Sequence, residues 1–199
     1  MIVALYEKTG NILQPWADAG YDCIALDIQH TGCVKRDGIF YAHWDALETP
    51  EPPYEAGVFG AASPPCDHLA VSGARWFKGK GLRALARSIE LFAVAAEYFE
   101  NSSAAYLIEN PVSTISTYWR KPDHTFHPWQ YSGFELSDDY TKKTCLWAGN
   151  GFVMPEPFHG EVNPDDRIHK AAPGPERANF RSAMPMGFAR AVFKANAPC

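Results

Sequence analysis

Short apolar segments that end in polar residues recur along the chain, with helix-like segments between them. Strand-like runs occupy residues 2–6, 23–26, 58–62 and 104–108, and residues 38–41 have the pattern of a further short strand. Helical spacing of apolar residues is clearest between residues 82 and 99, and residues 11–19 and 187–195 also have a helical pattern. Strands that alternate with helices are typical of an α/β fold with a mainly parallel sheet and helices on both faces.

Composition adds limits to this picture. With 199 residues, 46% of them hydrophobic, the chain can bury a full core, and we expect one domain over residues 1–199. Prolines, glycines and charges are concentrated in the tail, so we expect irregular structure over about residues 150–185. The longest mainly apolar run, residues 89–98, is too short to span a membrane, and the first residues lack the pattern of a signal peptide. We therefore expect a cytoplasmic protein.

The net charge of −5 argues against a protein that binds nucleic acid over its whole surface. One local basic segment is present, with five positive charges between residues 75 and 87. On composition alone this segment is better explained as a solvated helix face.

The first strand-like run is followed by a turn that contains Gly10, a helix-like stretch, a second strand and then Asp27. The acid lies 17 residues beyond the glycine, close to the spacing of roughly 20 residues in nucleotide-binding α/β folds. Such loops often carry two or three glycines, and this one carries only Gly10, so a plain structural turn is nearly as good an interpretation.

Two predicted strand ends carry reactive side chains. The sequence Ser-Pro-Pro-Cys ends at Cys66, and its paired prolines form a stiff, extended turn that can hold the cysteine at the edge of the sheet. Glu109 begins the sequence Glu-Asn-Pro, and an acid buried after an apolar strand is costly unless it has partners. A lone cysteine is more often inert packing than a nucleophile, but ligands of open α/β sheets bind beyond the carboxyl ends of the strands. We therefore predict that Cys66 and Glu109 share a functional site.

These two motifs resemble the Pro-Cys and Glu-Asn-Val motifs of the DNA cytosine-C5 methyltransferases, and the resemblance extends along the whole chain. It is greatest to short bacteriophage-type members, since the chain has no room for a large target-recognition domain. The resemblance implies a Rossmann-like S-adenosylmethionine-dependent methyltransferase fold, S-adenosylmethionine as cofactor, and double-stranded DNA with a flipped cytosine as partner. Two positions depart from the family pattern, because Pro111 replaces the valine and Asp67 replaces an amide.

The resemblance also implies a mechanism. The Cys66 thiolate would attack carbon 6 of cytosine, so that carbon 5 becomes nucleophilic enough to accept a methyl group. Glu109 would contact N3 and the exocyclic amine of the same base. Because a free thiol is only a few per cent ionised at pH 7, we expect the pKa of Cys66 to be lowered, with Arg75 and the loop amides as candidates. Lys142 and Thr144 stand where the family often has two arginines that bind the base carbonyl and brace the acid.

The remaining site residues follow from the same resemblance. Asp27 would bind the ribose hydroxyls, Asp45 the adenine amino group, and Ile28 one face of the adenine. The expected cofactor residues are Tyr6, Thr9, Gly10, Asp27, Ile28, Asp45 and Pro65, and the expected nucleic-acid contacts are Ser72, Gly73, Arg75, Lys78 and Arg83. With the resemblance, we favour phosphate contacts for the basic segment through Arg87, and Trp76 could stack on a base.

Several alternatives stay open. The same chemistry on a free nucleotide would suit the acidic net charge and the missing recognition domain, and a catalytically silent nucleic-acid-binding module would retain the fold. Methyltransferases of exocyclic amines carry an aromatic residue where this chain has Cys66, which argues against them. The histidines near Cys66 and at positions 124 and 127 lack a recognised metal-ligand framework, so we expect no metal. For the tail residues Arg167, His169, Arg177 and Arg181, DNA contact and simple solvation are equally open.

Overall fold

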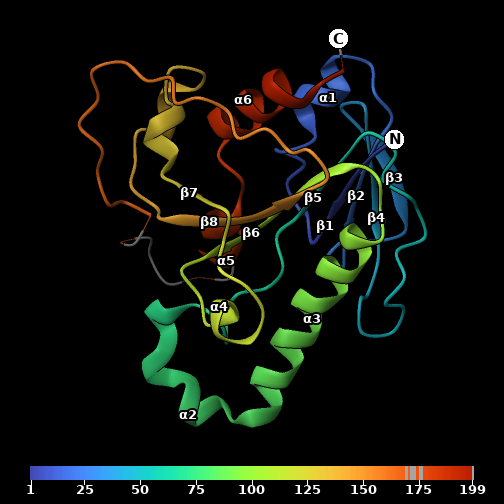
Figure 1. The fold of residues 1–199 in the computed structure, drawn as a ribbon, viewed down its shortest axis with the longest axis vertical. Coiled ribbons are helices and arrows are strands. Elements are labelled where there is room, and N and C mark those ends of the chain that lie inside the picture. Colours follow the sequence, from blue (N-terminus) through green and yellow to red (C-terminus); the bar gives the residue numbers. More distant parts are fainter. Residues whose placement is uncertain (169, 171–173, 175–176, 199) are drawn as a thin grey trace.

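The computed structural model describes residues 1–168, 170, 174 and 177–198, and it contains an eight-stranded mixed sheet (Figure 1). The strand order is β3-β4-β2-β1-β5-β6-β8-β7. The strands are β1 (Ile2–Leu5), β2 (Cys23–Asp27), β3 (Cys33–Arg36), β4 (Ile39–His43), β5 (Phe59–Ala62), β6 (Ala105–Pro111), β7 (His124–Phe126) and β8 (Thr144–Gly149).

Helices connect most of these strands. The α-helices are α1 (Gln14–Asp18), α2 (Phe77–Lys80), α3 (Leu82–Glu100), α4 (Ile115–Tyr118), α5 (Arg177–Ser182) and α6 (Met186–Asn196). Short 3₁₀ helices are η1 (Val71–Trp76), η2 (Pro128–Tyr131) and η3 (Leu136–Asp138). The fold is therefore of the α/β class, as the sequence pattern predicts.

Parallel strands form the centre of the sheet. Strands β4, β2, β1, β5 and β6 are parallel neighbours, whereas β3 pairs antiparallel with β4 at one edge and β8 and β7 are antiparallel at the other. Chain order runs outward from β1 in both directions, first through β2 and β4 and then through β5 and β6. Ligands of open α/β sheets bind where the order reverses in this way, which here is the carboxyl end of β1 and β5.

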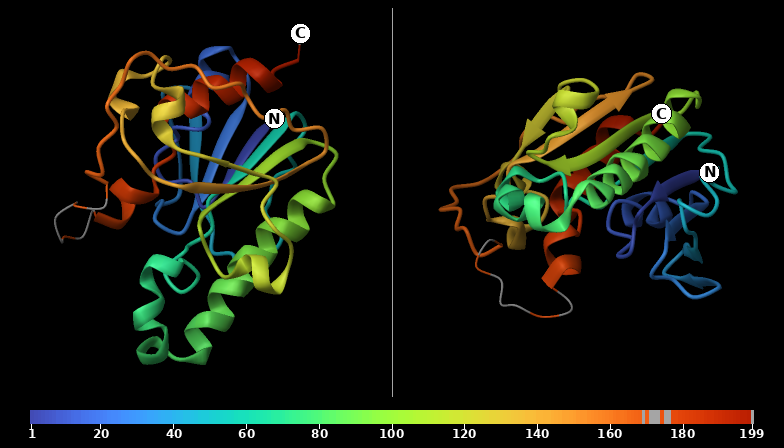
Figure 2. Two further views of the ribbon diagram at one scale, coloured as in Figure 1. Left: turned by 60° about the vertical axis from the view of Figure 1, so that its left-hand side comes forward. Right: turned by 90° about the horizontal axis from the view of Figure 1, so that it is seen from below.

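The two faces of the sheet pack against different helices. Successive side chains of a strand point to opposite faces, and in β1 Val3 belongs to the core that contains Phe99 of α3. Ile2 belongs to the other core, which contains Trp16 of α1 and Phe188 of α6. Figure 2 shows α3 running along one side of the sheet. These buried aromatic residues fix both helical layers onto the parallel strands, because each removes a large apolar area from water.

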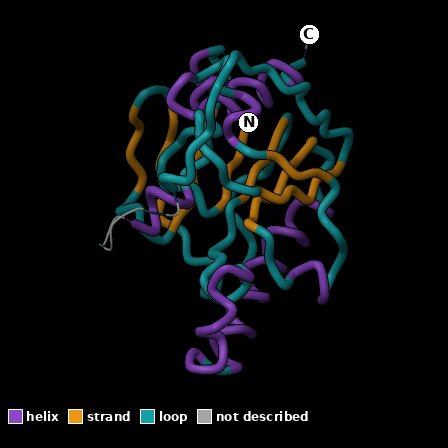
Figure 3. The backbone as a smooth tube through the Cα atoms, turned by 90° about the vertical axis from the view of Figure 1, so that its left-hand side faces the viewer, coloured by secondary structure: helices purple, strands orange, loops and turns teal. Residues whose placement is uncertain are grey.

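One helical segment projects from the sheet. The helix α2 and the first turns of α3 extend away from the strands, at the bottom of Figures 1 and 3. Most side chains of η1 and α2 are exposed, among them Trp76 at 59%. This segment follows directly on the turn that carries Cys66.

The predicted strands and the helices over residues 82–99 and 187–195 agree with the observed elements. Neither β3 nor β7 was predicted from the pattern, since all four residues of β3 are exposed and β7 has only three residues. The tail expected to be irregular contains the short helix α5. In the described part of the chain, no helix has both the length and the apolar character of a membrane span.

Candidate active site

The turn that ends at Cys66 and the strand that contains Glu109 lie side by side. β5 and β6 are parallel neighbours, with Ala62 opposite Ile108, so Glu109 and the turn after β5 leave the sheet at the same edge. The fully buried Asn110 side chain donates a 2.9 Å hydrogen bond from Nδ2 to the carbonyl of Pro64. A buried hydrogen bond of this kind fixes the turn relative to the strand, because breaking it would leave both groups without a partner.

The segments that follow the two motifs are also joined. Ala70 forms an antiparallel bridge with Ser113. The Val71 amide donates to the Val112 carbonyl at 3.0 Å, and the Thr114 amide donates to the Leu69 carbonyl at 2.9 Å. The structure therefore brings together the two motifs that the sequence places far apart.

Lys142 approaches Glu109 from the segment that leads into the neighbouring strand. In the antiparallel pair of β6 and β8, Glu109 lies opposite Leu146 and Pro111 opposite Thr144, so Thr144 and Glu109 belong to one face of the sheet. Lys142 lies two residues before Thr144, where β8 begins. The Lys142 Nζ lies 3.6 Å from Glu109 Oε1, and the two side chains are only 12% and 7% exposed. Thr144 is buried, and its hydroxyl donates to the Lys142 carbonyl at 3.2 Å. Lys142 is thus the side chain that braces the acid, and Thr144 supports the backbone beside it.

One oxygen of Glu109 has no hydrogen-bond partner among the described residues. Among the described residues, no hydrogen-bond donor is in place for the buried Glu109 Oε1, and its contact with Lys142 is an ion pair longer than a hydrogen bond. Buried carboxylate oxygens are normally satisfied, so an unfilled one points to a missing donor.

The surroundings of Cys66 favour the protonated thiol over the thiolate. Burial, together with the negative charges of Glu109 and Asp67, raises its pKa to about 11, and Lys142 offsets only part of this rise. The expectation of a lowered pKa is therefore wrong. Arg75 lies exposed on η1, and it is not among the groups that shift this pKa; the cysteine's own amide has a small lowering effect.

A buried acid that the sequence analysis did not identify organises the loop after β1. Glu7 Oε1 accepts hydrogen bonds from the Thr9 amide at 2.7 Å, the Thr9 hydroxyl at 2.5 Å and the Gly10 amide at 2.7 Å. Burial raises the pKa of Glu7, although these donors favour its charged form. The available signal was an acid placed two residues before Thr-Gly, where its carboxylate can reach the following amides.

Gly10 has a structural reason to be glycine. Its φ is +84°, and a Cβ at this position would lie 2.1 Å from the Tyr41 hydroxyl oxygen. That hydroxyl donates to the Thr9 carbonyl at 3.3 Å. The preceding turn begins at Tyr6, which also has a positive φ of 55°. The loop is therefore held in one shape from both of its ends.

The expected cofactor residues lie at the carboxyl ends of β1, β2, β4 and β5 or on the loops that follow them. Burial raises the pKa of Tyr6, and the charges of Asp45 and Asp27 raise it further, so both acids lie near this ring. Asp27 Oδ1 accepts from the Gln29 amide at 2.7 Å. Ile28 is 51% exposed beside it, and Pro65 is exposed on the turn after β5. Three separate loops thus contribute acids or apolar surface at the carboxyl edge of the sheet.

The expected nucleic-acid residues are mostly on the projecting segment. Ser72 and Arg75 are exposed on η1, Lys78 is exposed on α2, and Gly73 is half-buried. The Arg75 guanidinium lies 5.0 Å from the centroid of the Trp76 ring. Arg83 is exposed on α3, where it lines a cavity with Asp45 rather than extending the same patch.

The tail residues have other surroundings. Arg167 forms ion pairs with Asp139 and Asp165, so it serves intramolecular contacts. Arg177 and Arg181 are partly exposed on α5, and His169 lies outside the described residues. Across the described ranges, no three His, Cys, Asp or Glu side chains gather closely enough to hold a metal ion.

Comparison of the chain with protein-family models gives no matching family, and comparison with curated proteins gives no match. The functional assignment therefore depends on the residues and their geometry.

Proposed function

We propose that this protein is a DNA cytosine-C5 methyltransferase that uses S-adenosylmethionine. The observation that carries the proposal is the junction of the two motifs, where the Asn110 side chain ties Glu109 to the turn of Cys66 and Lys142 braces the acid. A nucleophilic sulfur and a buried carboxyl group on adjacent strand ends suit attack on one atom of a pyrimidine and binding of another. The strand order that reverses at β1 is consistent with a Rossmann-like methyltransferase fold.

The loops at this edge of the sheet suit a cationic cofactor better than a phosphate-bearing one. Loops that bind phosphates direct free backbone N–H groups at the ligand. Here the Thr9 and Gly10 amides are already bonded to Glu7, and Asp27 and Asp45 add negative charge nearby. Tyr6, Thr9, Gly10, Asp27 and Asp45 would hold the cofactor, together with Ile28 and Pro65. When bound, S-adenosylmethionine supplies an electrophilic methyl group on a positively charged sulfur.

The chain's own residues account for the activation of cytosine. The Cys66 thiol gives up its proton to water, its Sγ forms a bond to carbon 6, and the electrons of the C5–C6 double bond move through the ring toward N3. A proton held between Glu109 and N3 stabilises that charge, and carbon 5 then accepts the methyl group. Loss of the proton from carbon 5 to a base restores the double bond, the bond from sulfur to carbon 6 breaks, and the thiolate is released.

The high pKa of Cys66 is compatible with this mechanism. Because the charge of Glu109 raises the Cys66 pKa, a proton on Glu109 would remove part of the penalty against the thiolate. The Lys142 ammonium favours the thiolate throughout. Binding of a base to Glu109 is therefore coupled to ionisation of the nucleophile.

The projecting segment favours DNA over a free nucleotide as substrate. Arg75 and Lys78 are exposed with Trp76 on η1 and α2, which follow directly on the Cys66 turn. Basic side chains with an exposed aromatic residue suit contact with phosphates around an extruded base. A free nucleotide would need no such surface outside the pocket.

Covalent trapping tests the proposal. Duplex DNA that contains 5-fluorocytosine, with S-adenosylmethionine, should give a covalent protein–DNA complex, since fluorine on carbon 5 cannot leave as the proton does. Cys66→Ser should abolish the complex, and the matched change at the exposed thiol, Cys33→Ser, should preserve it. Transfer of labelled methyl to deoxycytidine monophosphate but to no DNA would show the free-nucleotide activity instead. Binding of S-adenosylmethionine without transfer to either substrate would indicate a silent module.

A further inference from the structure

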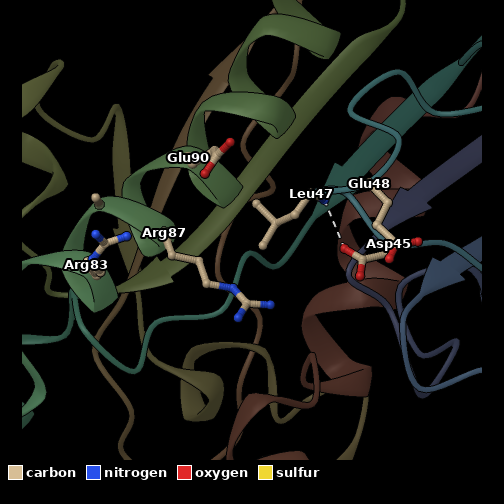
Figure 4. A pocket seen from close by; sticks show the side chains of 7 residues that line it. Asp45, Leu47, Glu48, Arg83, Arg87 and Glu90 are labelled. Carbon is tan, nitrogen blue, oxygen red and sulfur yellow. Dashed lines mark hydrogen bonds between the residues drawn. The ribbon is translucent and has the colours of Figure 1, made fainter.

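A cavity of about 560 Å³ lies between α3 and the loop that follows β4 (Figure 4). Arg83, Arg87 and Glu90 line it from α3, at spacings that place them on one face of the helix. The opposite wall is formed by Asp45, Leu47 and Glu48. Figure 4 shows Arg87 reaching from α3 toward the wall that carries Asp45.

This cavity shares Asp45 with the residues expected to hold the cofactor. The Asp45 charge also acts on Tyr6, which is another of those residues. The Tyr6 hydroxyl donates to the Leu91 carbonyl of α3 at 2.8 Å, and its ring packs on Trp44 with centroids 5.3 Å apart. The start of the loop after β4 and the middle of α3 are therefore held together next to the lining residues Asp45 and Glu90.

The charges of the cavity are mixed and are not paired across it. Three acids and two arginines line it, and in the described part of the chain no ion pair joins either arginine to the opposite wall. An excess of acids disfavours a phosphate, which argues against Arg87 as a DNA contact. A neutral heterocycle with donors on one edge and acceptors on another would satisfy both signs.

We infer that Arg87 is a specificity-determining residue for the nucleobase of the cofactor, which rests on the proposed use of S-adenosylmethionine. Adenine offers an amino group to Asp45, an apolar face to Leu47, and ring nitrogens that accept from the Arg87 guanidinium. Arg87 therefore has a different role from Arg75 and Lys78, which belong to the same basic segment of the sequence but lie on the projecting part. Residues of α3 therefore contact the adenine of the cofactor, in addition to residues at the strand ends.

Isothermal titration with S-adenosylhomocysteine tests this assignment. Arg87→Met keeps the length of the side chain and should weaken binding by about tenfold or more, the usual loss for a hydrogen bond from a charged donor. Arg75→Met is the matched control, and it should change this affinity by less than about twofold while it weakens binding to duplex DNA. Unchanged binding of S-adenosylhomocysteine by Arg87→Met would overturn the inference.

Binding of cofactor analogues distinguishes a contact between Arg87 and the adenine from a merely structural role of Arg87. The wild type should bind at least one of the 1-deaza, 3-deaza and 7-deaza adenine analogues about tenfold more weakly than S-adenosylhomocysteine, because one acceptor is missing. Arg87→Met should bind that analogue and the parent equally. Equal binding of all four ligands by the wild type would overturn the inference, even if Arg87→Met were unfolded. A wild type that binds none of them would instead overturn the proposed function.

Discussion

The charge around Cys66 can be tested directly through the reactivity of its sulfur. Only the thiolate is alkylated, and a thiol with a pKa of about 11 is ionised to roughly one part in a thousand at pH 8. Glu109 and Asp67 raise this pKa and Lys142 lowers it, with burial as the largest cause. Glu109→Gln should therefore speed alkylation, and Lys142→Met should slow it.

The size of the effect follows from the same causes. The pKa of Cys66 is raised from 9.0 to about 11, and the share of Glu109 is smaller than that of burial. Removing the Glu109 charge should thus lower the pKa by about 0.5 to 1 unit, which raises the thiolate fraction roughly threefold to tenfold below pH 10. Lys142→Met should change the rate in the opposite direction by less, since its contribution is smaller than those of both acids.

Iodoacetamide alkylation between pH 7 and 10, followed by peptide mass spectrometry, measures these rates. Alkylation of the exposed Cys33 is measured in the same sample and serves as the internal reference. In the wild type the Cys66 rate should still be rising steeply at pH 10. A plateau below pH 9, or slower alkylation in Glu109→Gln, would refute the electrostatic argument.

Three further changes test the loops that hold the site. Gly10→Ala should cost about 2–4 kcal/mol in urea unfolding, because of its φ of +84° and the 2.1 Å approach to Tyr41; Gly20→Ala, with a φ of +86° and open space, should cost only about 1 kcal/mol. Asn110→Ala should cost about 1–3 kcal/mol through its buried hydrogen bond, and a loss below about 0.5 kcal/mol would contradict this. Because burial raises the pKa of Glu7 above 4.5, wild-type stability relative to Glu7→Gln should fall as pH rises above 4.5, as urea titrations from pH 4 to 7 would show. A constant difference would contradict the shift.

The sequence predicted those parts of the fold whose burial leaves a pattern. β1, β2 and β5 are buried at every position, so they appear as continuous apolar runs bounded by turns. β3 is exposed at every position, and its place in the sheet depends on pairing with β4, which no local pattern records. The junction of Cys66 and Glu109 followed from strand ends, because parallel neighbours present their carboxyl ends at one edge.

The electrostatics of the site could not be predicted in the same way. Arg75 is close to Cys66 in sequence, but η1 carries it to the exposed surface, whereas Lys142 comes from the segment just before β8 and has the opposite effect to Glu109. Glu7 has the polar character of a loop residue, and its burial depends on three donors supplied by Thr9 and Gly10. Both cases depend on distances through space that sequence separation does not give.

One acid then has two effects in the proposed enzyme. Without a base in the site, the charge of Glu109 helps to keep Cys66 protonated, and a protonated thiol resists alkylation and oxidation. When a cytosine binds and Glu109 shares a proton with N3, that charge is reduced and the thiolate becomes more accessible at the moment of attack. Lys142 lies 3.6 Å from Glu109 and also lowers the pKa of Cys66, so it favours the thiolate both with and without a bound base. The proposed enzyme would therefore have a more reactive nucleophile with a base bound than without one.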